Sequence, residues 1–106
     1  MTREELIKLH EDTCNAARKT MIIKNQDYSC ESVNESPFSN FTGSEALGIE
    51  PVMGIMLRVF DKMKRIQAFS ANGTLSVENE SVHDAIEDIL NYVILAKGII
   101  ISREEK

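Results

Sequence analysis

The chain has few cysteines, and those it has do not form a recognisable site. Among its 106 residues only Cys14 and Cys30 are cysteines, and their separation fits neither a zinc-ligand pattern nor a disulfide framework. No secretory segment opens the sequence. We therefore expect a reduced, intracellular protein of the cytoplasm.

Basic residues and long apolar runs are also scarce. The net charge is −5, from 17 acidic and 12 basic residues, which argues against the diffuse basic surface that binds duplex nucleic acid. The most apolar run, Ile89 to Ile101, contains Asn91 and Lys97 and is shorter than the roughly 20 residues that span a bilayer. We expect neither duplex nucleic acid nor a membrane as a partner.

Several motifs that identify enzymes at once are missing. The sequence has no glycine loop for phosphates, no zinc-ligand spacing and no nucleophile elbow. It has no internal repeat, and its length suits one domain, residues 1–106, with a modest core. Any function must therefore come from less familiar arrangements of side chains.

Three segments have the apolar periodicity of amphipathic helices. The first runs from Thr2 to about Lys24 and the second from Pro51 to about Ser70. After a turn at Asn72-Gly73, Ser81 and Asp84 form a capping box for the third helix, and Ser102 to Lys106 form a frayed tail. The predicted fold is all-α, an antiparallel bundle of three main helices.

A long loop, Asn25 to Glu50, joins the first two helices, with a short helix predicted at Gly43 to Leu47. Its aromatic residues Tyr28, Phe38 and Phe41 indicate an ordered loop that folds back beside a ligand. Phe38 and Phe41 can equally fill the helical core. Tyr28, next to Asp27, is the better candidate for ligand binding.

The second half of the third helix is apolar on nearly every side. Three helices cannot cover all of this surface, which includes Leu90, Ile94 and Ile101. We therefore expect a homo-oligomer.

Two charged stripes are the strongest indication of function. Each falls within an arc of roughly 100° on its helix, so each is a coherent face opposite the apolar side. The second helix carries Arg58, Asp61, Lys62 and Arg65, and the region of the third carries Glu80, Asp84, Glu87, Asp88 and Asn91. Facing each other across an antiparallel pair, the two stripes can hold phosphate.

The acidic residues are candidates for a magnesium site. Asp61, Asp84 and Asp88 would form a cluster of three carboxylates that holds Mg²⁺ against a substrate phosphate, with Glu80 or Glu87 orienting water. Two simpler roles stay open, because Asp84 can cap its helix and Asp88 can pair with a basic residue of the second helix.

The basic residues Arg58, Lys62 and Arg65 permit another chemistry. Their donors match phosphate oxygens and need no metal. The alternative is that they only pair with the facing acids in a salt-bridge network.

A series of short motifs, in this order, carries a family resemblance. They are Lys24-Asn25-x-Asp27-Tyr28, Pro37-Phe38-x-Asn40-Phe41, Gly48, Arg58-x-x-Asp61-Lys62-x-x-Arg65, Glu80-Ser81-x-x-Asp84 and Asp88-x-x-Asn91-Tyr92. From about Lys24 to Leu95 the chain resembles a nucleotide-modification-associated domain of phages and bacteria. The resemblance implies binding of a nucleotide and extends the candidate ligand-binding set to Lys24, Asp27, Tyr28, Phe41, Arg58, Lys62, Arg65 and Asn91.

That family is similar in helical pattern to MazG-like all-α nucleoside triphosphate pyrophosphatases. These hold Mg²⁺ with a Glu-x-x-Glu pair and a Glu-x-x-Asp pair, which by resemblance places Asp61 in the first motif and Asp84 with Asp88 in the second. Here the helix of the first motif, Pro51 to about Ser70, offers Asp61 among three cations, and the second pair, Asp84 and Asp88, is spaced by four residues. Both departures weaken the pyrophosphatase interpretation.

Three hypotheses follow. The first is a protein that sequesters a phosphorylated nucleotide or a nucleotide-derived signal without turnover, in phage counter-defence or in guarding a nucleotide pool. The second is a Mg²⁺-dependent pyrophosphohydrolase acting on a noncanonical nucleotide. The third is a helical interaction module whose charged faces only set the helix register.

Overall fold

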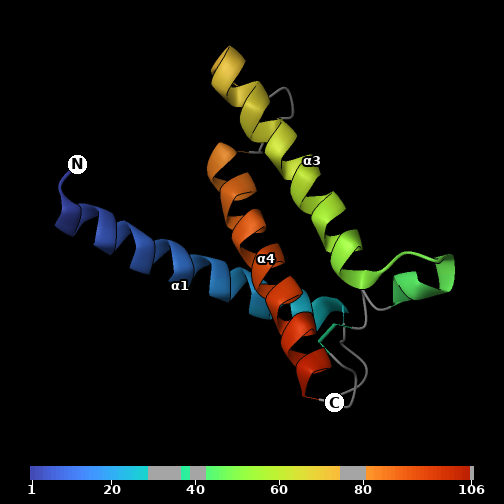
Figure 1. Ribbon diagram of the computed structural model, residues 1–106. Helices are drawn as coiled ribbons and strands as arrows, with labels where there is room; N and C mark the ends of the chain where they lie inside the picture. Colours follow the sequence, from blue (N-terminus) through green and yellow to red (C-terminus); the bar gives the residue numbers. More distant parts are fainter. Residues whose placement is uncertain (29–36, 39–42, 75–80, 106) are drawn as a thin grey trace.

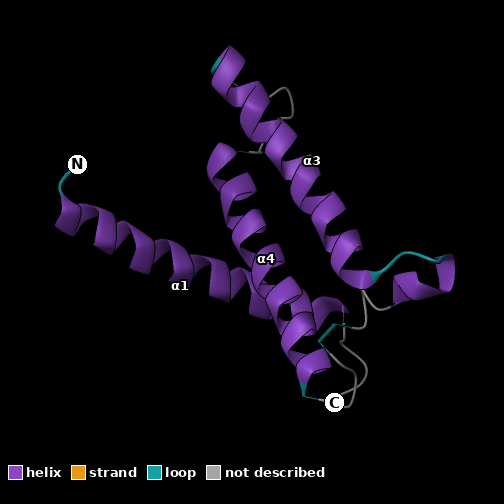
Figure 2. Ribbon diagram, in the orientation of Figure 1, coloured by secondary structure: helices purple, strands orange, loops and turns teal. Residues whose placement is uncertain are grey.

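The structure is a computed structural model that describes residues 1–28, 37–38, 43–74 and 81–105, without the side chains of residues 25–28, 43 and 44. Within these ranges lie three α-helices, α1 (Arg3–Tyr28), α3 (Pro51–Asn72) and α4 (Val82–Glu104), and a short 3-10 helix, η1 (Gly43–Leu47). The described ranges contain no strand (Figure 2). The predicted all-α class and the short helix at Gly43 to Leu47 are confirmed.

Local sequence signals explain where α3 begins and ends and where α4 begins. The Glu50 side chain accepts a hydrogen bond from the Met53 amide at 2.8 Å, and Pro51 follows in the first turn of α3. Gly73 ends this helix with a φ of 77°, which favours glycine. At the start of α4 the Ser81 hydroxyl accepts from the Asp84 amide at 3.1 Å, which is the N-cap bond of the predicted capping box.

The first helix begins with a capping box that the sequence analysis did not identify. The Thr2 hydroxyl accepts from the Glu5 amide at 3.1 Å, and the Thr2 amide donates to the Glu5 carboxylate at 3.1 Å. At its other end α1 continues to Tyr28, four residues beyond the predicted end at Lys24. Asp27 and Tyr28 therefore belong to a helix and not to the loop.

The core lies between α3 and α4, which run side by side in opposite directions (Figure 1). Ile55 and Val59 of α3 meet Ala96 and Ile99 of α4, and all four are buried. Partly buried apolar and aromatic side chains surround this cluster: Phe38, Val52, Met56, Ile89, Tyr92 and Leu95.

Phe38 fills the core, which was one of the two roles left open for it. Its ring lies against Gly98, where an added Cβ would come within 2.7 Å of the Phe38 Cζ atom. Glycine at this position therefore makes room for the ring. Phe41 lies outside the described residues, which leave out 29–36 and 39–42 of the loop predicted to be ordered.

The last turn of α4 is helical and tied to the start of α3. The Arg103 guanidinium donates to the Glu50 carboxylate, so residues predicted to fray are held against another helix. The bond from Arg103 and the bond from the Met53 amide together lower the pKa of the Glu50 carboxyl.

The helix α1 crosses α4, and its N-terminal half extends away from the other helices (Figure 1). Ala17 is buried at the crossing, where a small side chain lets the two helices approach closely. Residues 1–12, by contrast, are all exposed. None of the described helices is long and apolar enough to span a membrane.

Candidate functional site

Three of the predicted site residues come together where α1, α3 and α4 meet. Lys24 of α1 lies 3.4 Å from one carboxylate oxygen of Asp88 in α4, and Lys62 of α3 lies 3.0 Å from the other. We call Lys24, Lys62 and Asp88 the lysine–aspartate cluster. It joins all three α-helices through side chains that are distant in the sequence.

The cluster is partly shielded from solvent. The side chains of Asp88 and Lys62 are each 18% exposed, and that of Lys24 is 52% exposed. Two ammonium groups share one carboxylate, so the cluster carries a net positive charge at neutral pH. An ion pair at this depth is less screened by salt than one on the open surface.

Asn91 lies one turn beyond Asp88 and has a structural contact. It is buried, and its side-chain amide donates to the Ala17 carbonyl oxygen at 3.0 Å. This bond fixes the crossing of α1 over α4 next to the cluster. Asn91 was a candidate for ligand binding, but its side-chain amide is engaged by the backbone of α1.

The other basic residues of α3 lie on either side of Lys62. Arg65 pairs with Asp61 of the same helix at 3.8 Å, and Arg58 precedes Lys62 by one turn and is exposed. The prediction of one basic stripe is consistent with this placement. Its central member, Lys62, is the one that reaches across to α4.

The predicted three-carboxylate cluster does not form. Asp88 is engaged by two lysines, Asp61 is exposed beside Arg65, and Asp84 is exposed in the first turn of α4. Among the residues that the structure describes, no group of three or more His, Cys, Asp or Glu side chains is placed to hold a metal ion. Among the described residues, Asp61, Asp84 and Asp88 are therefore not gathered into the carboxylate site expected for Mg²⁺.

The structure describes the remaining candidate residues to different extents. Glu87 is half-buried on α4. Glu80 and Phe41 lie outside the described residues, and only the backbone of Asp27 and Tyr28 is described, three and four residues after Lys24 on α1.

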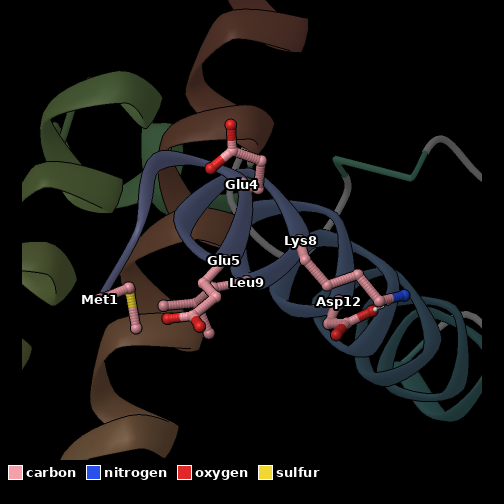
Figure 3. A pocket seen from close by; sticks show the side chains of 6 residues that line it. All are labelled: Met1, Glu4, Glu5, Lys8, Leu9 and Asp12. Atoms are coloured by element: carbon pink, nitrogen blue, oxygen red, sulfur yellow. Dashed lines mark ion pairs between the residues drawn. The ribbon is translucent and has the colours of Figure 1, made fainter.

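A shallow hollow lies elsewhere, on the exposed half of α1 (Figure 3). It is lined only by residues from the first turns of the chain: Met1, Glu4, Glu5, Lys8, Leu9 and Asp12. Lys8 and Asp12 form an ion pair across its edge at 3.0 Å. Since Met1 and a single helix form the hollow, and no candidate residue lines it, we place the site at the lysine–aspartate cluster.

The sequence pointed to Lys62 and Asp88 as possible partners but treated Lys24 only as part of a motif. Lys24 and Asp88 are 64 residues apart, so only the crossing of α1 over α4 brings them together. The signal available in advance was the position of Lys24 on the same helical stripe as Thr13, Ala17 and Thr20.

Comparison with known proteins supplies no relative: no protein-family model, no curated protein and no solved structure matches this chain.

Proposed function

We propose that this protein binds a phosphorylated nucleotide, or a signal derived from one, at the lysine–aspartate cluster and holds it without turnover. The observation that carries the proposal is the convergence of Lys24 and Lys62, from two helices, on the single carboxylate of Asp88. Two ammonium donors in a partly shielded position suit phosphate oxygens. A phosphate group can take the place that Asp88 occupies between them.

Neighbouring residues support a ligand larger than phosphate. Arg58 and Arg65 lie about one turn from Lys62 on α3, within reach of further phosphate oxygens. Tyr28 follows Lys24 by about one turn on α1 and is the proposed stacking partner for a base. Phosphate contacts would thus come from α1 and α3, and the base contact from the end of α1.

The competing function is Mg²⁺-dependent hydrolysis of a noncanonical nucleoside triphosphate. It would need Asp88 to leave both lysines and to join Asp61 and Asp84 around the ion. Capture requires only that a phosphate compete with Asp88 for the same lysines. We therefore prefer capture.

The wider setting belongs to the proposal as well. Many large apolar side chains are exposed in a single copy of the chain, which supports a homo-oligomer of antiparallel helical bundles. Following the resemblance to the phage and bacterial domain, capture would sequester a defence messenger or guard a modified nucleotide pool in the cytoplasm of the host cell.

Calorimetric titration with a panel of nucleotides and cyclic nucleotides tests the proposal. We expect at least one to bind the wild type, and Lys62→Met to weaken it by roughly 10-fold or more through loss of a charged contact. Lys8→Met is the matched control, because Lys8 pairs with Asp12 on the exposed half of α1. Equal losses in both variants, or no binding by the wild type, would contradict capture.

A second experiment separates capture from turnover. Asp88→Asn removes the carboxylate that competes for the lysines, so it should tighten nucleotide binding. If Asp88 is instead a metal ligand, Asp88→Asn abolishes product formation in Mg²⁺. Chromatography of the nucleotide after incubation with wild type and variant distinguishes the two, since capture returns it intact from both proteins.

A further inference from the structure

The outward face of α4 has the spacing of a coiled-coil seam. Ile86, Leu90, Val93, Lys97 and Ile100 follow one another at steps of four, three, four and three residues. Apolar residues at this spacing form the contact line between paired helices, and a single charged residue in the line selects register and orientation. We call these five residues the α4 seam.

The α4 seam points away from both helices that α4 already contacts. At 100° per residue it is centred roughly 110° from Ala85, Ala96 and Ile99 and roughly 140° from Asn91. The first three are buried on the side of α4 that includes the core, and Asn91 contacts α1. Ile86, Val93 and Ile100 are 45%, 41% and 43% exposed, and Leu90 between them is half-buried, so a large part of the seam is open to solvent.

Charge along α4 favours a second copy of the same helix in the opposite direction. The charged residues nearest the seam are Glu87 in the first half of α4, and Lys97 and Glu104 in the second half. Asp84 and Asp88 lie on the opposite side of the helix, and Arg103 pairs with Glu50. An antiparallel pair places Glu87 of each copy beside Lys97 of the other. A parallel pair would instead bring Lys97 against Lys97 of the second copy.

We propose that two copies of this chain associate through an antiparallel pairing of their α4 seams, centred on Val93. In this register Lys97 packs over Leu90 of the second copy and extends its ammonium to Glu87, one turn away on the same helix. The interface is isologous, since each contact occurs twice about the two-fold axis. It also covers the exposed isoleucines of α4.

This association leaves the lysine–aspartate cluster accessible. Asp88 lies roughly 160° around α4 from the centre of the seam, on nearly the opposite side of the helix. The assembly therefore carries one cluster per copy on its outer sides. The inference does not rest on nucleotide binding, and either can fail without the other.

Sedimentation analysis of the full chain tests the interface. We expect the wild type to associate, and Val93→Glu to raise its dissociation constant at least about 100-fold, because it buries two charges at the centre of the seam. Leu57→Glu is the control, since Leu57 is exposed on α3 away from the seam. A monomeric wild type, or association unchanged in Val93→Glu, would overturn the proposal.

Charge reversal tests the orientation, with circular dichroism to confirm that each variant is folded. Glu87→Lys and Lys97→Glu should each weaken association, because each puts like charges together. The double variant exchanges the two charges and should restore it. Failure of the double variant to associate more tightly than both single variants would exclude the antiparallel register.

Discussion

The α3–α4 pair and the N-terminal half of α1 have the same kind of amphipathic sequence and different surroundings. Ile55 of α3 is fully buried at 0% exposure, whereas Ile7 of α1 is 63% exposed. Both residues belong to helices with a capped N-terminus. The comparison shows that capping and periodicity produce a helix, but burial depends on a second helix to pack against.

Truncating each of the two isoleucines should give the largest difference in the free energy of unfolding between the two regions. Ile55→Ala leaves a cavity in the core and should lower the free energy of unfolding by about 2–5 kcal/mol. Ile7→Ala is the matched change on α1 and should stay within about 0.5 kcal/mol. Chemical denaturation measures both. Similar losses would mean that the first half of α1 is covered in solution.

A change at Gly98 tests how tightly the α3–α4 core holds Phe38. Gly98→Ala places a methyl group 2.7 Å from the Phe38 ring and should destabilise the fold by about 1–3 kcal/mol. This result would reverse the ordinary preference of helices for alanine over glycine. In a Phe38→Ala background the same change should be neutral or stabilising, as thermal unfolding of the four proteins would show.

The hydrogen bond between Asn91 and the Ala17 carbonyl connects α4 to α1. Asn91→Ala should cost about 1 kcal/mol, from the loss of one buried hydrogen bond. Because the bond holds the crossing, amide exchange near Ala17 should rise more than exchange within α3. Asn15→Ala, at an exposed position of α1, should change neither quantity.

The smallest expected effect concerns the pH dependence of the contact between Glu50 and Arg103. The pKa of Glu50 is lowered in the folded protein from its ordinary value of 4.5, so the stabilisation is present above that value. It is lost as the pH falls through the lowered pKa. Glu50→Gln should therefore show a smaller fall in melting temperature than the wild type between about pH 6 and about pH 3. Glu45→Gln, an exposed control, should follow the wild type.

The sequence predicted those parts of the fold that depend on neighbouring residues. Pro51, Gly73 and Ser81 act within one turn of themselves, and the helices that they begin or end lie where expected, to within a few residues. The end of α1 was placed too early because Asn25 and Asp27 resemble loop residues, although the helix continues to Tyr28. Helix ends without a strong capping residue are the least determined by local sequence.

The candidate site could be predicted only in part, for a different reason. That Lys62 and Asp88 face each other follows from the antiparallel return of α4 along α3. That Lys24 joins them depends on how α1 crosses α4, a contact that also requires the fit of Ala17 against its neighbours and that the periodicity of α1 alone does not determine. The position of Phe38 against Gly98 is likewise a contact between distant segments.

The contact between Arg103 and Glu50 also affects which helix ends unfold first. A helix terminus usually frays first, because its last turn has the fewest hydrogen bonds and exchanges its amide protons fastest. Here the last turn of α4 is fastened to the cap of α3, so fraying one end exposes the other. The final turn of α4 and the first turn of α3 should therefore gain and lose exchange protection together, as one cooperative unit.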